Sequence, residues 1–221
     1  MLPSTRHPRA FTLIEMLVVM AVIAILAALI LSINGLVQGK AARTRADVEI
    51  RALSAGCDSY KADNGSYPQD KDKTDGLDPR TIGTPSSYQA SSLFLYKELS
   101  GDTDADGRNE PNATPPEGKN YLPDFFTPQR LSGGQSSSGA MTSVSYIKDP
   151  YGNSYGYSTK GAAAEQQYRV DVSKDSSKTR PAGVGYNPTF DLWSTAGKNI
   201  NPITGDLGTP KDITNSWVKN W

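Results

Sequence analysis

Closely spaced carboxylates are the clearest candidates for chemistry in this sequence of 221 residues. The segment Asp102–Gly107 reads DTDADG, so its aspartates alternate with other residues and end at a glycine. Alternate carboxylates can converge on one hard cation, and glycine permits the sharp turn that this requires. An EF-hand also needs a bidentate glutamate at the twelfth loop position, where Ala113 stands. The spacing excludes an EF-hand and predicts a looser calcium-binding turn at Asp102, Asp104 and Asp106, with a solvated acidic loop as the alternative.

Histidine and cysteine each occur once, as His7 and Cys57. A catalytic triad or a multi-histidine zinc site is therefore not available to the chain beyond its N-terminal tail, and Cys57 cannot form a disulfide within the chain. The 23 Lys and Arg residues balance 23 Asp and Glu residues, which leaves no surplus of cations for a phosphate backbone. We expect neither an enzyme nor a nucleic-acid partner. A single-pass membrane-anchored enzyme or binding module remains the alternative from a different class.

The apolar residues gather near the N-terminus. Met16–Ile33 reads MLVVMAVIAILAALILSI and carries no charge. At about 1.5 Å per residue, such a helix is near the length that crosses a hydrocarbon core. The rest of the chain is too polar to enclose it, so the run predicts membrane insertion rather than a buried helix. Basic residues flank it on both sides, and the charge rule does not decide its orientation.

The helical pattern continues beyond this run and then stops. Val37–Asn64 contains no proline, and Gly65 with Pro68 supplies a stop signal. Apolar residues recur there at spacings of three or four, which predicts one buried stripe on a helix. The stripe consists of Ala42, Ala46, Ile50, Leu53, Cys57 and Tyr60. We expect one helix over Phe11–Asn64 whose second half packs against a sheet.

The remainder, Gly65–Trp221, is rich in turn formers and predicts a small α+β head with an antiparallel sheet and long loops. A short helix is expected over Ser91–Leu99, capped by Ser91 or Ser92 and ended by Gly101. Strands are expected over residues 142–148, 154–159, 168–172 and 189–194. A turn at residues 149–153 joins the first two.

The residues around the start of the apolar run carry a family resemblance. Arg9-Ala10-Phe11-Thr12-Leu13-Ile14-Glu15, leading straight into the run, resembles the N-terminal signature of type IV pilins and type II secretion pseudopilins. The resemblance implies that residues 1–10 are a leader, which a membrane peptidase removes before it methylates the new amine of Phe11. The family norm before the cut is glycine, and Ala10 departs from it.

Glu15 acquires a role in this context. A carboxylate beside an apolar span is costly, although less so than the ~2.5–3.5 kcal/mol of a mid-span position. Either it reaches the lipid headgroups, or it pairs with the amine of Phe11 on a neighbouring subunit. At about 4 Å and an effective dielectric of 20, such a pair has ~4 kcal/mol of Coulomb attraction before desolvation is subtracted. Leader removal then creates the charge that assembly needs.

The C-terminal half narrows the resemblance to the major pseudopilin of type II secretion. The motifs are DPYGN at residues 149–153, FDLWS at 190–194, and Asp212-Ile213 with Trp217. The family surrounds a calcium-binding loop with such motifs, but its first aspartate is absent here, which leaves Asp206 and Asp212 as metal candidates. Residues 69–143 match no family pattern.

The resemblance implies a structural role in a filament. The domains expected are a leader at 1–10, a transmembrane and stalk helix at 11–64, and a periplasmic head at 65–221. The implied function is a subunit of a periplasmic pseudopilus, held in the bacterial inner membrane before assembly. Implied partners are the prepilin peptidase and methyltransferase, other copies of the chain, other pseudopilins, inner-membrane assembly proteins and lipid. A type IV pilin for adhesion, motility or DNA uptake is the alternative, although many pilins use a disulfide that this chain cannot form.

Overall fold

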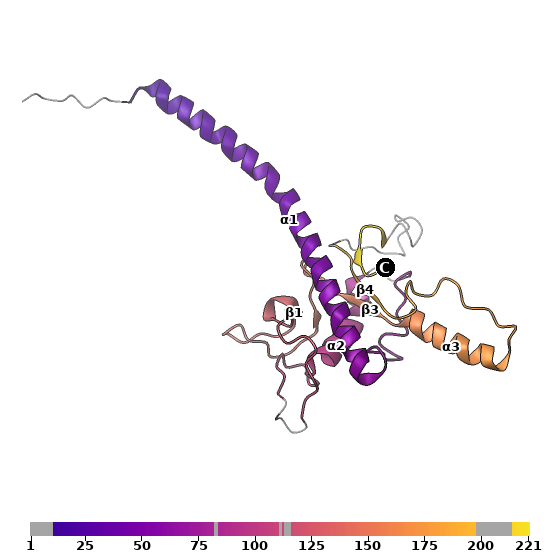
Figure 1. Ribbon diagram of the computed structural model, residues 1–221. Coiled ribbons are helices and arrows are strands. Elements are labelled where there is room, and N and C mark those ends of the chain that lie inside the picture. The colour runs from indigo at the N-terminus through magenta and orange to yellow at the C-terminus, as the bar shows by residue number, and fades with distance from the viewer. Residues whose placement is uncertain (1–10, 82–83, 111, 113–115, 198–213) are drawn as a thin grey trace, which may run out of the picture. The chain divides into compact units, whose positions relative to one another are not determined.

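The computed structural model describes residues 11–81, 84–110, 112, 116–197 and 214–221, with the side chains of residues 29–37 left out. The chain divides into two compact units, Met1–Ala41 and Ala42–Trp221. We call the second unit the head. The long helix α1, Leu13–Asn64, runs through both (Figure 1). This confirms the expected helix over Phe11–Asn64 to within two residues at its start.

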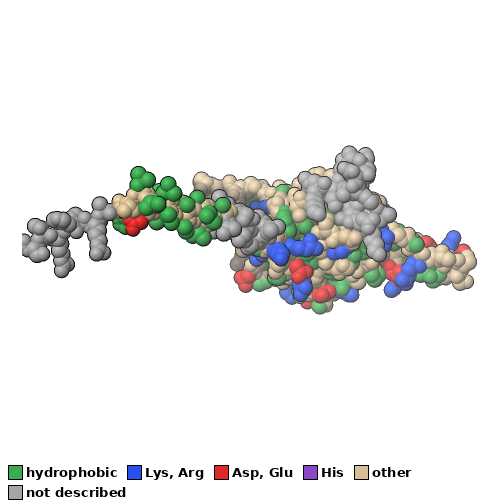
Figure 2. All heavy atoms as spheres, turned by 90° about the horizontal axis from the view of Figure 1, so that it is seen from above, with side chains coloured by type: hydrophobic (Ala, Val, Ile, Leu, Met, Phe, Trp, Pro, Cys, Tyr) green, Lys and Arg blue, Asp and Glu red, His purple; other side chains and the backbone are tan. Residues whose placement is uncertain are grey.

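The described part of α1 in the first unit exposes its apolar side chains. Phe11 is 73% exposed, Leu13 84% and Met20 66%. Figure 2 shows apolar side chains along this part of the helix, on the face in view. Over the residues that the structure describes, no helix meets the length and apolarity needed to cross a membrane. The membrane span expected over Met16–Ile33 therefore stays a prediction.

The head is built on the second half of α1. The stripe expected from the sequence is buried at Ala46, Ile50, Leu53 and Cys57, whereas Ala42 and Tyr60 are half-buried. Its partners in the core come from a helix as well as from a sheet. They are Leu95, Leu99, Tyr155, Tyr157 and Leu192. Each large apolar side chain buried there stabilises the head by ~1.5–3 kcal/mol relative to exposure.

The helix expected over Ser91–Leu99 is α2, Gln89–Ser100, preceded by the 3-10 turn η1, Pro85–Tyr88. Neither serine caps it: Tyr88 is the N-cap residue, without a side-chain cap. Ser91 donates to the carbonyl of Tyr88, and Ser92 accepts the backbone N–H of Ile147. The Ser92 hydroxyl, which the sequence assigned to a cap, thus binds the backbone of Ile147 instead. The stop at Gly101 is confirmed, since its φ of 79° is left-handed.

The strands form two small antiparallel sheets. β1, Leu131–Ser132, follows the 3-10 turn η2, Pro128–Arg130, and pairs with β2, Tyr146–Ile147. The second sheet has the order β3-β4-β5, with β3 at Gly156–Ser158, β4 at Asp191–Ser194 and β5 at Val218–Lys219. Strands were therefore expected correctly within three of the four ranges. Strands β1 and β5 were not expected, and both are only two residues long.

The strand expected over residues 168–172 is wrong. These residues lie in α3, Lys160–Lys174. Tyr168, Val170 and Val172 alternate with the polar residues Arg169 and Asp171, which resembles a strand, but only the two valines are β-branched. The run AAAEQQ before them consists of strong helix formers, and helix propensity summed over the segment wins. The α+β class expected for the head is confirmed.

Candidate functional site

The N-terminal motif forms a closed hydrogen-bonded turn at the start of α1. The backbone N–H of Thr12 donates to Glu15 Oε2 at 2.9 Å, and the Thr12 hydroxyl donates to the same oxygen at 3.0 Å. The backbone N–H of Glu15 in turn donates to Thr12 Oγ1 at 3.3 Å. This reciprocal arrangement is a capping box, which satisfies two backbone donors that a helix start otherwise leaves unpaired.

The capping box holds the carboxylate of Glu15 against the backbone N–H of Thr12, the residue that follows Phe11. Both side chains are exposed. The negative charge also lies at the positive end of the helix dipole, where it is favoured. Sequence reasoning missed the box, although Thr12-x-x-Glu15 before an apolar run is its signature. Ala10, the residue expected before the cut, lies outside the described residues.

The acidic turn after α2 brings its three aspartates together as the spacing predicted. One carboxylate oxygen from each of Asp102, Asp104 and Asp106 lies within 4.8 Å of the others. The turn depends on left-handed backbone at Ala105, with φ 62°, and at Gly107, with φ 92°. Three hard oxygen ligands at this separation suit a calcium ion, which needs further oxygens to complete its shell.

Asp102 is fully buried, and the protein supplies hydrogen bonds to both of its oxygens. Its Oδ1 accepts the backbone N–H of Ala105 at 2.6 Å, and its Oδ2 accepts the Tyr96 hydroxyl at 2.5 Å and the backbone N–H of Gly107 at 2.8 Å. Burial raises the pKa of Asp102 despite these donors. Asp102 therefore supplies the buried part of the turn's hydrogen bonding, and Asp104 and Asp106, which accept the N–H groups of Asp106 and Arg108, are the more accessible ligands. The other metal candidates, Asp206 and Asp212, lie outside the described residues.

The DPYGN turn is tied to strand β4 through one buried carboxylate. Asp149 Oδ1 accepts the backbone N–H groups of Tyr151 at 3.0 Å and Asn153 at 2.8 Å, which folds the turn. Its Oδ2 accepts the Ser194 hydroxyl at 2.5 Å. Burial raises the pKa of Asp149, although Ser194 and the turn amides oppose this. Two of the motifs that carried the resemblance are thus joined by one residue of each.

The C-terminal motif packs against β4 and α1. The rings of Trp193 and Trp217 are stacked at 5.9 Å, and Tyr88 meets Trp193 edge-on at 5.3 Å. Arg43 donates from Nη1 to the carbonyl of Ser216 at 2.7 Å and from Nη2 to that of Trp217 at 3.2 Å. This role of Arg43 could not be foreseen, because the partner is backbone 173 residues further along the chain.

The comparisons with known proteins point to the class of proteins that carry a prepilin-type N-terminus. Residues 5–31 match the prokaryotic N-terminal methylation motif. The chain is also similar to one particular protein: it is 36% identical over 80 residues to type II secretion system core protein G of Pseudomonas aeruginosa. The alignment covers 36% of this chain and 56% of the relative, so the chain spans just over half of that relative's length. No solved structure matches the chain. The motif and the relative together confirm the resemblance to type II secretion pseudopilins.

Proposed function

We propose that this chain is a structural subunit of a periplasmic pseudopilus in type II protein secretion. The single observation that carries the proposal is the N-terminal methylation motif at residues 5–31, which runs into an apolar helix. The similarity to a core protein of the type II secretion system supports the same role, and it favours a structural over a catalytic one. In this proposal a prepilin peptidase cuts after Ala10 and methylates Phe11.

The exposed apolar half of α1 also supports assembly. The large side chains at positions such as Leu13, Ile14 and Leu17 are more than half exposed, and an isolated soluble chain rarely tolerates so continuous an apolar surface. We propose that inner-membrane lipid covers this surface before assembly and that neighbouring pseudopilin helices cover it afterwards. The partners follow from the same proposal: further copies of the chain, other pseudopilins and inner-membrane assembly proteins.

Glu15 is the residue on which assembly is proposed to depend. In the capping box its carboxylate receives only neutral donors, both from Thr12. Cleavage adds a cationic amine at Phe11, whose Coulomb attraction to the carboxylate adds to the hydrogen bond that it donates. A neighbour's amine can therefore bind the carboxylate while the helix cap is kept, because each carboxylate oxygen can accept more than one donor.

The test separates the two roles of Glu15. Glu15→Gln retains an acceptor for the cap but loses the charge, whereas Glu15→Ala loses both. We expect both variants to be cleaved and recovered with the membrane, and both to be depleted at least tenfold from sheared or cross-linked filaments. The matched control is Glu110→Gln, which neutralises an exposed glutamate of the head. Normal filament yield from Glu15→Gln contradicts the charge pairing.

A further inference from the structure

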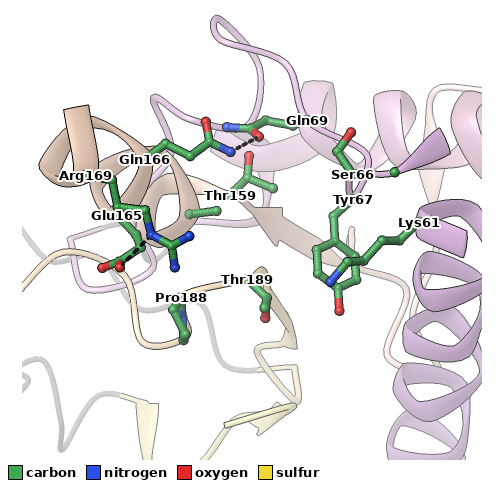
Figure 3. A pocket seen from close by; sticks show the side chains of 12 residues that line it. Lys61, Ser66, Tyr67, Gln69, Thr159, Glu165, Gln166, Arg169, Pro188 and Thr189 are labelled. Carbon is green, nitrogen blue, oxygen red and sulfur yellow. Dashed lines mark hydrogen bonds and ion pairs between the residues drawn. The ribbon is translucent and has the colours of Figure 1, made fainter. Parts of the chain in front are cut away.

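A polar groove in the head lies between the last turn of α1 and the first turns of α3. It has a volume of about 360 Å³ and is closed at one side by the loop at Pro188 and Thr189. Figure 3 shows Lys61 reaching it from α1 and Arg169 reaching it from α3 on the opposite side. The groove is thus walled by two cations from elements about 100 residues apart in the chain.

The acceptors that line the groove are already engaged. Glu165 has a side chain only 13% exposed, and it accepts Arg169 Nε at 3.2 Å and Arg180 Nε at 3.1 Å. Gln69 Oε1 accepts Gln166 Nε2 at 3.3 Å. Behind the groove, Asp75 accepts from Thr159 at 2.7 Å and from Gln69 at 2.9 Å. Little acceptor capacity therefore remains for a ligand that donates hydrogen bonds.

The donors that remain are positively charged or hydroxyl groups. Lys61 Nζ lies 4.4 Å from the ring centre of Tyr67, and no described residue gives it a carboxylate partner. Arg169 uses its Nε for Glu165, so within the described ranges the two terminal nitrogens of its guanidinium have no partner. The hydroxyls of Ser66 and Thr189 are likewise unengaged by described residues. Such a set favours a ligand that is anionic and rich in acceptors.

The walls of the groove carry a positive excess. The lining residues Lys61 and Arg169 face the single acid Glu165, which leaves one positive charge in excess. Behind the walls, Arg180 binds Glu165, Asp75 accepts from Gln69, and Asp58 accepts the Tyr67 hydroxyl at 3.1 Å, so this outer layer does not add to the excess. Tyr67 adds an aromatic wall that holds the Lys61 ammonium over its face. The volume also lies within the range of ~300–1,000 Å³ that is usual for ligand sites.

We propose that this groove binds an acidic segment of polypeptide that presents two carboxylates. The two cations reach the groove from opposite walls (Figure 3), so two carboxylates can each face one of them. In an extended peptide, residues i and i+2 point the same way about 6.6–6.8 Å apart, so one face of such a segment presents two separate carboxylates. The proposal involves the head alone and does not rest on filament assembly.

The experiment uses the full chain in detergent and a fluorescein-labelled tetraglutamate peptide, followed by fluorescence anisotropy at low salt. We expect saturable binding that Lys61→Gln with Arg169→Gln weakens at least tenfold. The matched control is Lys148→Gln with Arg108→Gln, which removes the same charge outside the groove and should bind as the native chain does. An unlabelled tetralysine peptide should not compete.

Two further measurements distinguish a peptide ligand from a small anion and from general charge attraction. Competition by glutarate or inorganic phosphate as effective as that of unlabelled tetraglutamate overturns the peptide in favour of a small free anion. Equal affinity of native chain and groove variant, or equal losses in groove and control variants, overturns the site and leaves only general charge attraction. An unchanged melting temperature of the groove variant shows that the loss does not come from unfolding.

Discussion

The carboxylate of Glu15 shows how one residue serves local structure and proposed function together. It caps its own helix by accepting from Thr12, and Thr12 is the residue next to the Phe11 amine that cleavage would create. The family motif indicates the pairing of Glu15 with a neighbour's amine. The capping role was not predicted, although the spacing Thr12-x-x-Glu15 is its signature. The capping box means that loss of Glu15 has a local cost of ~0.3–1.5 kcal/mol in helix stability even without assembly.

Asp191 offers a prediction at the level of a single titrating group. It is buried at the start of β4, where it accepts the backbone N–H groups of Tyr186 and Asn187 at 2.9 Å. Desolvation outweighs these donors and raises the pKa of Asp191 from 3.8 to about 6. The folded chain therefore retains a proton that the unfolded chain releases as the pH rises from about 4 to about 6.

The raised pKa of Asp191 makes the folded chain less stable as the pH rises. The stability contributed by protonated Asp191 is complete below the unfolded pKa and is lost as the pH rises through the folded one. Relative to Asp191→Asn, which cannot ionise, the native chain should lose up to about 3 kcal/mol of unfolding free energy between pH 4 and pH 7. Urea unfolding of both proteins across this range measures the difference. Asp175→Asn is the control, because the Ser177 hydroxyl and N–H lower the pKa of exposed Asp175 and place its effect below this window. A constant difference between native and Asp191→Asn contradicts the prediction.

Among the elements, the long helix was predictable and the short strands were not. The stripe from Ala46 to Cys57 follows the helical period, and burial of one face fixes that period in the sequence. Strands β1 and β5 have two residues each, too few for any alternation to appear. Their positions depend on long-range packing, such as the pairing of Ser194 in β4 with Val218 in β5.

The candidate site divides in the same way. The acidic turn was predictable because its three aspartates lie within five residues and are brought together by local backbone turns. The hydrogen bonds from Tyr96 to Asp102 and from Ser194 to Asp149 were not predictable, because they depend on how the elements pack. A sequence indicates which carboxylates exist, but not which of them the folded chain will bury.

Gly156 in β3 gives a prediction about the fit between strands. It pairs with Trp193 in β4, and a Cβ at residue 156 would lie 2.1 Å from Trp193 Cε2. Gly156→Ala should therefore displace the indole and destabilise the head by about 1–3 kcal/mol, the usual cost of overpacking. Chemical denaturation measures this, with Gly76→Ala as control, since a Cβ there meets nothing closer than 3.7 Å. Equal stability of the two variants contradicts the close fit at Trp193.

The acidic turn gives a prediction about calcium. An ion that binds only the folded chain stabilises it by RT ln(1 + [L]/Kd), about 2.7 kcal/mol at a hundredfold excess over Kd. The melting temperature of the full chain in detergent should rise with millimolar calcium and fall with chelator. Asp104→Asn with Asp106→Asn should remove the response while Asp102 still organises the turn.

Asp206→Asn with Asp212→Asn is the parallel variant, and it removes the response instead if the C-terminal candidates hold the ion. A native melting temperature that neither calcium nor chelator changes contradicts both sites. Asp104 and Asp106 are then acidic surface groups that bind no calcium.

At the scale of the whole molecule, the chain combines two surfaces with opposite requirements. The described helix of the first unit exposes apolar side chains, whereas the head encloses its apolar residues in a core. In the proposed function the two requirements meet in order: lipid covers the helix first, and neighbouring helices cover it after the leader is removed.

In the proposed function, leader removal must precede assembly of the chain. The family expectation is a small residue before the cut, and Ala10 adds only one methyl group to the usual glycine. The mature chain should begin at Phe11 and carry about 14 Da of added methyl mass, which is visible in the mass spectrum of the intact protein. Ala10→Phe should abolish cleavage because a bulky ring replaces that methyl, and Ala10→Gly should be cut at least as well as the native chain. Uncut Ala10→Phe should remain with the membrane and stay out of filaments, since it lacks the amine that is proposed to pair with Glu15. A mature terminus found after Ala28 indicates ordinary signal-peptide cleavage instead, and filaments built from uncut chains contradict the dependence of assembly on the Phe11 amine.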